Sequence, residues 1–428
     1  MKSSCCKICK KNYISGLLIL PVFFFVGICI LLCSAKIFKL GKTRNTGGAV
    51  STNIINWENE YPFFEKDIIE RQSITHKLQT KVNNIESRID SLVLNYFPFY
   101  YSILEVGNGI EKVLNWKIPV NNGYDSAVDL GDGYYTNYVR KINTEKSSES
   151  IIEFSEYCKK SEFVNNFVYV QAPYKIGQAE KNSELDYSNK NADTLLKNIQ
   201  SKINYLDLRD RIKLENLNNR DLFYKTDHHW KTKSTLWATK EIVSYLNSEL
   251  GMQFPESVLE EDNFTYNSYE SVFLGSIGKK LTKAKAKPDD FTVILPKKEV
   301  QLKIIQNGYE KSGTFSSLYD YSQLKNNDLY NSYPYDGFFA CNVGILENQV
   351  TDNKNSILII GDSFTRPLAA FLSLICRKVE RIDLAGFTGS IRKYIEKNGP
   401  YDAVIVLYNP ASIIEPNLEN HTSSFDFR

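Results

Sequence analysis

The chain has 428 residues, which is long enough for one large domain or two ordinary ones. Its 52 Lys and Arg residues are balanced by 50 Asp and Glu residues. No overall positive field therefore favours nucleic-acid binding, and no acidic excess indicates a solvating tail. Composition and charge thus argue against a nucleic-acid partner and leave the fold to be read from the pattern of residues.

An uncharged, strongly apolar segment runs from Ile14 to Ala35. A helix of ~20 apolar residues spans the hydrocarbon core of a bilayer, so we expect residues 14–37 to form a transmembrane anchor after a cytoplasmic tail, residues 1–13. A signal peptide is the alternative, but its apolar core usually has only ~7–15 residues. The short tail favours an inside start, which places the rest of the chain outside the cytoplasm.

Residues 38–98 are rich in charge and carry apolar residues at helical spacing, for example Ile74, Leu78, Val82 and Ile85. This periodicity predicts a helical stalk, with self-association as one role. A helix packed on the main domain fits the same pattern, and the residues do not decide between the two.

A catalytic domain is expected over residues 99–428, where strands and helices begin to alternate. A Gly-punctuated turn at residues 129–138 opens this region, and a helix follows residue 230 and ends at Gly251. The other elements expected here are strands at 167–173, 204–209 and 221–227 and a helix at 192–203.

Residues 255–350 interrupt the alternation, and we expect an insertion of loops and short strands there. Beyond it the alternation resumes, with strands at 356–360, 381–385 and 402–408 and helices at 367–378 and 390–399. Such alternation predicts an α/β fold with a parallel sheet, helices on both faces and ligand-binding residues at the carboxyl edge of the sheet.

Ser363 lies where such an edge is expected. It follows the apolar strand at 356–360, Gly361 permits a tight turn, and Pro367 suits the first turn of the next helix. A serine at this place exposes its hydroxyl, and its own N–H and those of its neighbours can face a developing oxyanion. The alternative is that Asp362 or Ser363 only caps the helix.

A serine nucleophile needs a base, and the chain has four histidines. His76 lies in the predicted stalk and His421 in a polar tail, which leaves His228 and His229. In an extended segment residues two apart share a side, so Asp227 and His229 are expected to face one way and His228 the other. Asp227 would then orient His229, as the acid of a catalytic triad does.

Two other interpretations of this stretch stay open. His228 and Trp230 fit the role of partly buried structural anchors. Asp227 and both histidines fit a metal site, but adjacent side chains diverge in an extended segment and no other His or Cys cluster supplies ligands. We therefore expect no metal and no cofactor.

The segments "YKTDHHW", "FLGSIG", "ILIIGDSF" and "YDAVIVLY", together with the "LGDGYY" turn, resemble the DHHW protein family. This family is related to the SGNH-hydrolase-like domains of the alginate O-acetylation proteins AlgX and AlgJ. The resemblance extends from about Asp129 to Asn409. In those domains an Asp-x-His precedes the serine, and Asp227, His229 and Ser363 match that order, so the resemblance implies that these three residues are catalytic.

The resemblance implies an SGNH-like enzyme outside the cytoplasm, in the bacterial envelope, where the apolar segment at residues 14–37 would hold it by a single membrane span. It would be a serine-dependent O-acetyltransferase, or an esterase, that acts on a cell-surface or secreted polysaccharide through an acyl-serine. The implied partners are the polysaccharide acceptor and a multi-pass membrane O-acyltransferase. Two alternatives remain: a non-catalytic scaffold that binds polysaccharide or a partner with an idle site, and a simple polysaccharide deacetylase.

The chain also departs from ordinary SGNH enzymes, because it has no Gly-x-Asn-Asp block. The second oxyanion donor is therefore not assigned by the sequence. Asn409, at the end of the last strand, and Arg366, three residues after Ser363, are the candidates for oxyanion or substrate contact. Both have ordinary alternatives, since Asn-Pro often ends a strand and an Arg at a helix start is often solvated.

Overall fold

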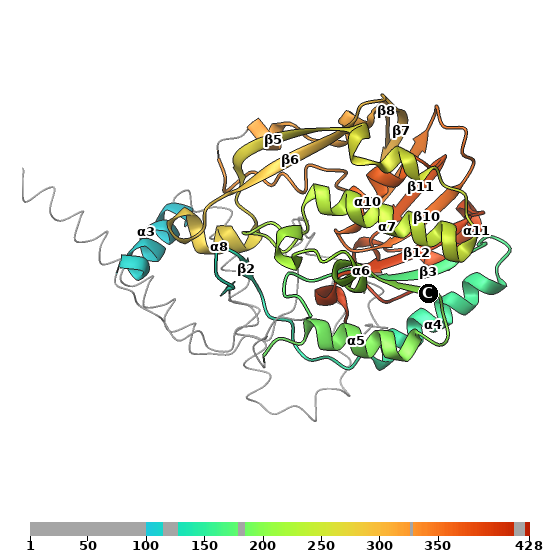
Figure 1. Ribbon diagram of the computed structural model, residues 1–428, viewed down its shortest axis with the longest axis horizontal. Coiled ribbons are helices and arrows are strands. Elements are labelled where there is room, and N and C mark those ends of the chain that lie inside the picture. Colours follow the sequence, from blue (N-terminus) through green and yellow to red (C-terminus); the bar gives the residue numbers. More distant parts are fainter. Residues whose placement is uncertain (1–99, 114–126, 179–184, 326–327, 415–423) are drawn as a thin grey trace, which may run out of the picture. The chain divides into compact units, whose positions relative to one another are not determined.

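The computed structural model describes residues 100–113, 127–178, 185–325, 328–414 and 424–428 (Figure 1). The chain divides into two compact units, Met1–Asn122 and Gly123–Arg428. In the first unit the structure describes the helix α3 (Tyr100–Val113). The predicted tail, anchor and stalk, residues 1–98, lie outside the described residues. Within the described ranges no helix is both long enough and apolar enough to cross a bilayer.

An eight-stranded sheet forms the centre of the second unit (Figure 1). Five neighbouring strands are parallel, as the alternating pattern predicts, and three antiparallel strands extend one side. In spatial order the strands are β4 (Tyr205–Asp207), β3 (Phe167–Gln171), β12 (Ala403–Tyr408), β10 (Ser356–Gly361), β11 (Lys378–Ile382), β9 (Val343–Asn348), β7 (Gln301–Gln306) and β8 (Tyr309–Thr314).

Helices cover both faces of this sheet, because successive strand residues point to opposite sides and both sides are apolar (Figure 1). On β10, Ile357 and Ile359 belong to one buried cluster, while Leu358 and Ile360 belong to another. The first cluster contains α6 (Leu208–Leu214), α7 (Thr232–Leu250) and α10 (Thr365–Leu372), and the second contains α4 (Glu145–Lys160), α5 (Ser188–Ile199) and α11 (Ile391–Asn398).

Two turns expected from glycine are present. Gly251 ends α7 with φ of 67°, a left-handed conformation that costs glycine little. The hairpin of β1 (Val128–Asp129) and β2 (Tyr135–Thr136) turns through Gly131 and Gly133, with φ of 87° and 79°. Both positions would strain a side chain.

The segment 255–350 differs from the expected insertion. It supplies β7, β8 and β9 to the main sheet, because β9 pairs with β11 and β7 pairs with β9. It also forms a second, two-stranded sheet of β5 (Phe264–Phe273) and β6 (Asp289–Pro296), and the helices α8 (Ser276–Lys285) and α9 (Ser322–Lys325). Strands are therefore present as expected, but three of them extend the main sheet, and the two helices of the segment were not predicted.

The expected strand at 221–227 is also absent. Asn219–Leu222 is a short 3₁₀ helix, η2, and Phe223 makes only an isolated bridge with Trp230. Between Phe223 and Trp230 the chain turns back on itself. Side-chain hydrogen bonds within this turn, such as that from the backbone N–H of His229 to Asp227 Oδ1, outweigh the strand propensity of its aromatic residues.

Candidate active site

The turn after β10 presents Ser363 at the carboxyl edge of the parallel strands. Gly361 lets β10 pass close to β12, since a Cβ built there would lie 2.0 Å from the carbonyl oxygen of Leu407. The buried carboxylate of Asp362 accepts hydrogen bonds from the backbone N–H groups of Phe364 and Asn409, each at 2.9 Å. Ser363 itself is half-buried. The sequence thus fixes the turn and leaves the hydroxyl accessible.

A fully buried arginine supports this turn from the neighbouring strand. Arg381, on β11, donates to Thr365 Oγ1 at 2.7 Å and to the carbonyl oxygen of Asp362 at 3.0 Å. It also donates to the carbonyl oxygen of Cys341. Because a guanidinium offers five donors in a rigid plane, one side chain satisfies several buried carbonyl groups around the turn.

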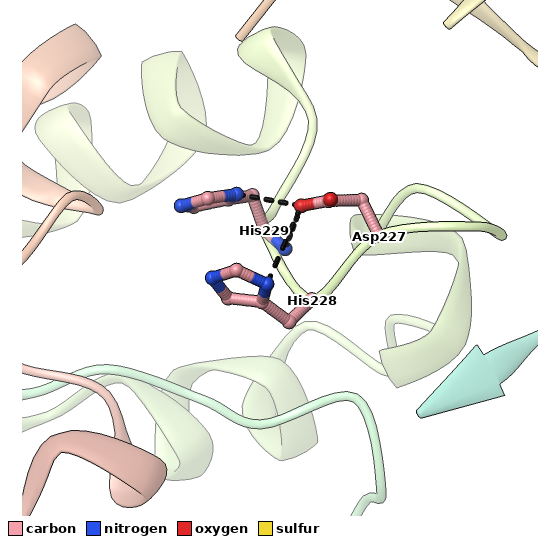
Figure 2. A group of neighbouring side chains, drawn as sticks. All are labelled: Asp227, His228 and His229. Carbon is pink, nitrogen blue, oxygen red and sulfur yellow. Dashed lines mark hydrogen bonds and ion pairs between the residues drawn. The ribbon is translucent and has the colours of Figure 1, made fainter. Parts of the chain in front are cut away.

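The turn between η2 and α7 brings the predicted acid and base to Ser363. The Ser363 Oγ lies 2.6 Å from Nε2 of His229, and Nδ1 of His229 lies 2.6 Å from Oδ1 of Asp227. Figure 2 shows the Asp227 carboxylate beside the rings of His228 and His229. With Nδ1–H donating to the carboxylate, Nε2 is free to accept the serine proton. The three residues named from the sequence therefore meet in triad geometry, although Ser363 comes from a distant segment.

The Asp227 carboxylate is fully buried, and hydrogen bonds occupy both of its oxygens. Oδ1 accepts from the ring and the backbone N–H of His229, and Oδ2 accepts from Ser276 N at 2.7 Å and from the Tyr333 hydroxyl at 2.5 Å. Burial raises the pKa of Asp227, but both histidines and the hydrogen bonds outweigh it and hold the pKa well below its usual range. Asp227 is therefore ionised near pH 7.

This saturation also argues against a metal site. Asp227, His228 and His229 form the one group of metal-ligating side chains that lie close together within the described residues. A cation there would have to displace hydrogen bonds that already satisfy both carboxylate oxygens. The donor set therefore does not fit a resident metal.

His229 is enclosed on both faces of its ring. Tyr335 stacks on it with centroids 3.8 Å apart, and the ring of His228 lies 3.9 Å away. Burial, reinforced by His228, lowers the pKa of His229 to about 3, while Asp227 opposes this shift. His229 is therefore neutral near pH 7, which is the form that can act as a base.

Two buried charges hold the turn that carries the acid and the base. Lys175, fully buried after β3, donates to the carbonyl oxygens of Tyr135, Lys225 and Asp227. Asp289, at the start of β6, accepts from Lys225 N at 2.7 Å and from the N–H and hydroxyl of Thr226 at 2.8 and 2.6 Å. Opposite charges thus bind the carbonyl and the amide groups of one short segment.

Burial also shifts the pKa values of Lys175 and Asp289 in the direction that favours their uncharged forms. Desolvation lowers the pKa of Lys175 to about 7 against the opposing effect of Asp227 and Asp289, and it raises the pKa of Asp289.

Two glycines of the "FLGSIG" segment permit a close approach to this turn. A Cβ at Gly275 would lie 2.3 Å from the Cβ of Asp227, and one at Gly278 would lie 2.7 Å from the Cβ of Thr226. Without side chains at these positions, Ser276 N reaches the Asp227 carboxylate. The segment therefore belongs to the site.

The predicted position of His228 was wrong. Because residues 227–229 form a turn and not an extended strand, His228 does not face away from Asp227. Its Nδ1 lies 3.6 Å from Asp227 Oδ1, and its side chain is 39% exposed, against 4% for His229. His228 therefore lies beside the other two residues at the surface of the site.

Asn409 and Arg366, the candidates for oxyanion or substrate contact, both interact with other side chains of the protein. Asn409 Nδ2 donates to Asp362 Oδ2 at 2.7 Å and to Ser412 Oγ at 3.0 Å, so both amide hydrogens are used. Arg366 pairs with Asp336, while its Nε is buried with no hydrogen bond to any described residue. Asn409 thus braces the nucleophile turn, and Arg366 keeps one donor available.

The backbone around Ser363 offers one oxyanion donor. The N–H of Ser363 makes no hydrogen bond within the described part of the chain, whereas those of Phe364 and Thr365 are bound to Asp362. The expectation that several neighbouring N–H groups face the oxyanion is therefore reduced to Ser363 alone.

Several site residues were missed from the sequence, namely Lys175, Ser276, Asp289, Tyr333 and Tyr335. Ser276 lies in "FLGSIG", one of the segments that carry the family resemblance. The two tyrosines are among 27 in the chain, and no local pattern distinguishes them.

Comparison with solved structures finds several similar proteins. Bacillus cereus PatB1, in a structure with a sulfonyl adduct, is 17% identical over 72% of this chain and 100% of that chain, with a TM-score of 0.57. A DHHW family protein from Eubacterium siraeum is 16% identical over 69% of this chain and 93% of that chain, with a TM-score of 0.50. The O-acetyltransferase domain of Pseudomonas putida AlgJ follows at 12% identity over 68% and 94%, with a TM-score of 0.39.

No protein-family model matches the chain, and no curated protein matches its sequence. The likeness therefore lies in the fold, at low identity. The resemblance to the DHHW family that the sequence predicts is confirmed at that level: the chain has a fold similar to those of a DHHW family protein and of PatB1.

Proposed function

We propose that the chain is a serine-dependent O-acetyltransferase, or an esterase, that works through an acyl-serine. The observation that carries this proposal is the continuous hydrogen-bonded chain from Ser363 through His229 to Asp227, with both contacts at 2.6 Å. PatB1, a protein with a similar fold, has been solved with a sulfonyl adduct, which supports a reactive nucleophile in a protein of this fold.

The reaction follows from the geometry. Ser363 Oγ attacks the acyl carbonyl carbon while Nε2 of His229 takes the hydroxyl proton, and Asp227 stabilises the imidazolium that forms. The Ser363 N–H hydrogen-bonds the oxyanion. The proton then passes to the departing alcohol, which leaves an acyl-serine. An incoming hydroxyl group gives its proton to His229 and attacks the acyl carbon. The bond from that carbon to Ser363 Oγ then breaks, and His229 returns the proton to Ser363.

The acceptor and the location of the enzyme belong to the same proposal. We expect a polysaccharide hydroxyl as acceptor, outside the bacterial cytoplasm, with the apolar segment at Ile14 to Ala35 as the membrane anchor and a multi-pass membrane O-acyltransferase as the source of acetyl groups. The resemblance stated from the sequence supports these points. Protease accessibility of the catalytic domain in intact cells tests the location.

Hydrolysis of a chromogenic acetyl ester tests the chemistry. Ser363→Ala is expected to lower the rate by about a thousandfold or more, because it removes the nucleophile. Ser373→Ala, a buried serine at the end of α10, is the matched control and should keep the rate of the folded protein. Equal rates in Ser363→Ala and the wild type would refute the serine mechanism.

A further inference from the structure

His228 has the placement of a functional side chain. It is the partly exposed member of the Asp227, His228 and His229 group, and its Nε2 makes no hydrogen bond to any described residue. A buried anchor would instead be enclosed, as Trp230 is. An exposed imidazole beside a nucleophile is available to a substrate.

The two imidazoles point the same way. Both rings turn Nδ1 toward Asp227 Oδ1, and Figure 2 shows their second nitrogens on the same side, away from that carboxylate. In that direction Nε2 of His229 meets Ser363 Oγ. The ring centroids are 3.9 Å apart, so Nε2 of His228 points to the side on which Ser363 meets His229.

The hydrogen bonds at Nδ1 favour one tautomer of His228. Asp227 Oδ1 already accepts two hydrogen bonds from His229, and it lies 3.6 Å from Nδ1 of His228. The Ser276 hydroxyl lies closer, at 3.4 Å, and it can donate to this nitrogen. A proton donated to Nδ1 leaves the ring hydrogen on Nε2, so His228 presents a donor to the substrate.

The position of the base, His229, indicates where the acceptor alcohol binds. His229 exchanges its proton with the attacking or departing oxygen, so groups beside its Nε2 lie beside the alcohol and not beside the oxyanion, which faces the Ser363 N–H. A polyol has further oxygens next to its reacting hydroxyl, whereas methanol and water have none.

We propose that His228 is a substrate-binding residue that donates a hydrogen bond from Nε2 to a second oxygen of a polyhydroxylated acceptor. This inference rests on the proposed function. The acceptor oxygen forms a bond to the acyl carbon, the bond from Ser363 Oγ to that carbon breaks, and the acceptor proton passes through His229 to Ser363. His228 keeps its own proton throughout and selects the acceptor.

Competition between two alcohols tests this role. The full chain is acylated with 4-nitrophenyl acetate in a mixture of glycerol and methanol, and the ratio of glyceryl acetate to methyl acetate is measured. This ratio is set after the acyl-enzyme has formed, so it does not depend on the acylation rate. Wild-type enzyme should prefer glycerol, and His228→Phe, which keeps a ring against His229, should lower the ratio about tenfold.

A second variant tests the same role if His228→Phe does not fold. Ser276→Ala keeps the backbone N–H that binds Asp227 but removes the hydroxyl partner of His228, and it should lower the same ratio by a smaller factor. An unchanged ratio in folded His228→Phe, no preference for glycerol in the wild type, or loss of acyl-enzyme in both variants would overturn the role of His228. A wild type that forms no acyl-serine would instead refute the proposed function.

Discussion

Single side chains determine what His229 can do. Its ring lies between Tyr335 and His228, and the side chain is only 4% exposed, so water does not stabilise a charge on it. Asp227 compensates only in part, and the pKa of His229 stays below its ordinary value. The base is therefore neutral at rest, and Asp227 stabilises the charge that appears during the reaction.

The pH dependence of acylation follows from this depressed pKa. Only neutral His229 accepts a proton, and its pKa in the folded chain lies below the ordinary ~6.5 of histidine. As the pH falls from 8 to ~6.5 His229 stays neutral, so kcat/KM for a chromogenic acetyl ester should stay level and decline only at lower pH. A half-maximal value at or above pH ~6.5 would contradict the depressed pKa.

The hydroxyl of Tyr333 is expected to matter although it touches no reacting atom. Tyr333→Phe keeps the ring but removes a donor to the buried Asp227 carboxylate, and such hydrogen bonds to charged groups contribute about 1.5–3 kcal/mol. We expect kcat to fall about tenfold with KM nearly unchanged. Tyr330→Phe is the control, since its hydroxyl meets Lys283 N and not the triad. Equal losses in both variants would show that the effect is not specific.

The sequence predicts the catalytic role of residues that lie in a recognisable motif. It does not predict the role of residues that position them from elsewhere in the fold. Asp227, His229 and Ser363 stand in short patterns whose spacing has a chemical meaning. Tyr333 and Lys175 reach the site only through tertiary packing, and nothing next to them in the chain signals it. The exposure of His228 depended on the conformation of a turn that its sequence does not determine.

The turn between η2 and α7 acts as one element that is fixed from both sides. Lys175 holds carbonyl groups of residues 225 and 227, and Asp289 holds N–H groups of residues 225 and 226. The alternation expected for an extended strand fails here because these buried partners, and Asp227 itself, hydrogen-bond the backbone in a different shape. Longer elements such as α7 and β12 were predictable because their apolar pattern extends over many residues.

Replacement of Lys175 tests how this turn is held. Lys175→Met removes the side-chain donor that binds three carbonyl groups, and we expect the free energy of unfolding to fall by about 1.5–3 kcal/mol, the contribution of hydrogen bonds to a charged group. Denaturant unfolding measures this. Lys159→Met, which removes an exposed lysine with one carbonyl contact, should change stability by less than about 0.5 kcal/mol. A Lys175→Met chain as stable as the wild type would contradict the account.

The complete fold brings the site together from segments far apart in the chain. Ser363 follows β10, His229 precedes α7, and Tyr333 and Asp289 come from the segment 255–350. This segment extends the sheet through β9 and β7, so it is part of the catalytic unit. The parallel core was predictable from alternating strands and helices, but the antiparallel pairing was not, because it joins distant strands without a helical crossover.

The most direct test of the account is whether Ser363 reacts as a nucleophile in a way that depends on His229. We predict that a sulfonyl fluoride modifies one residue, that peptide mapping by mass spectrometry identifies it as Ser363, and that His229→Ala slows the modification by about a thousandfold. Modification of another residue, or modification of Ser363 at the same rate without His229, would contradict the proposal that these two distant residues form one catalytic unit.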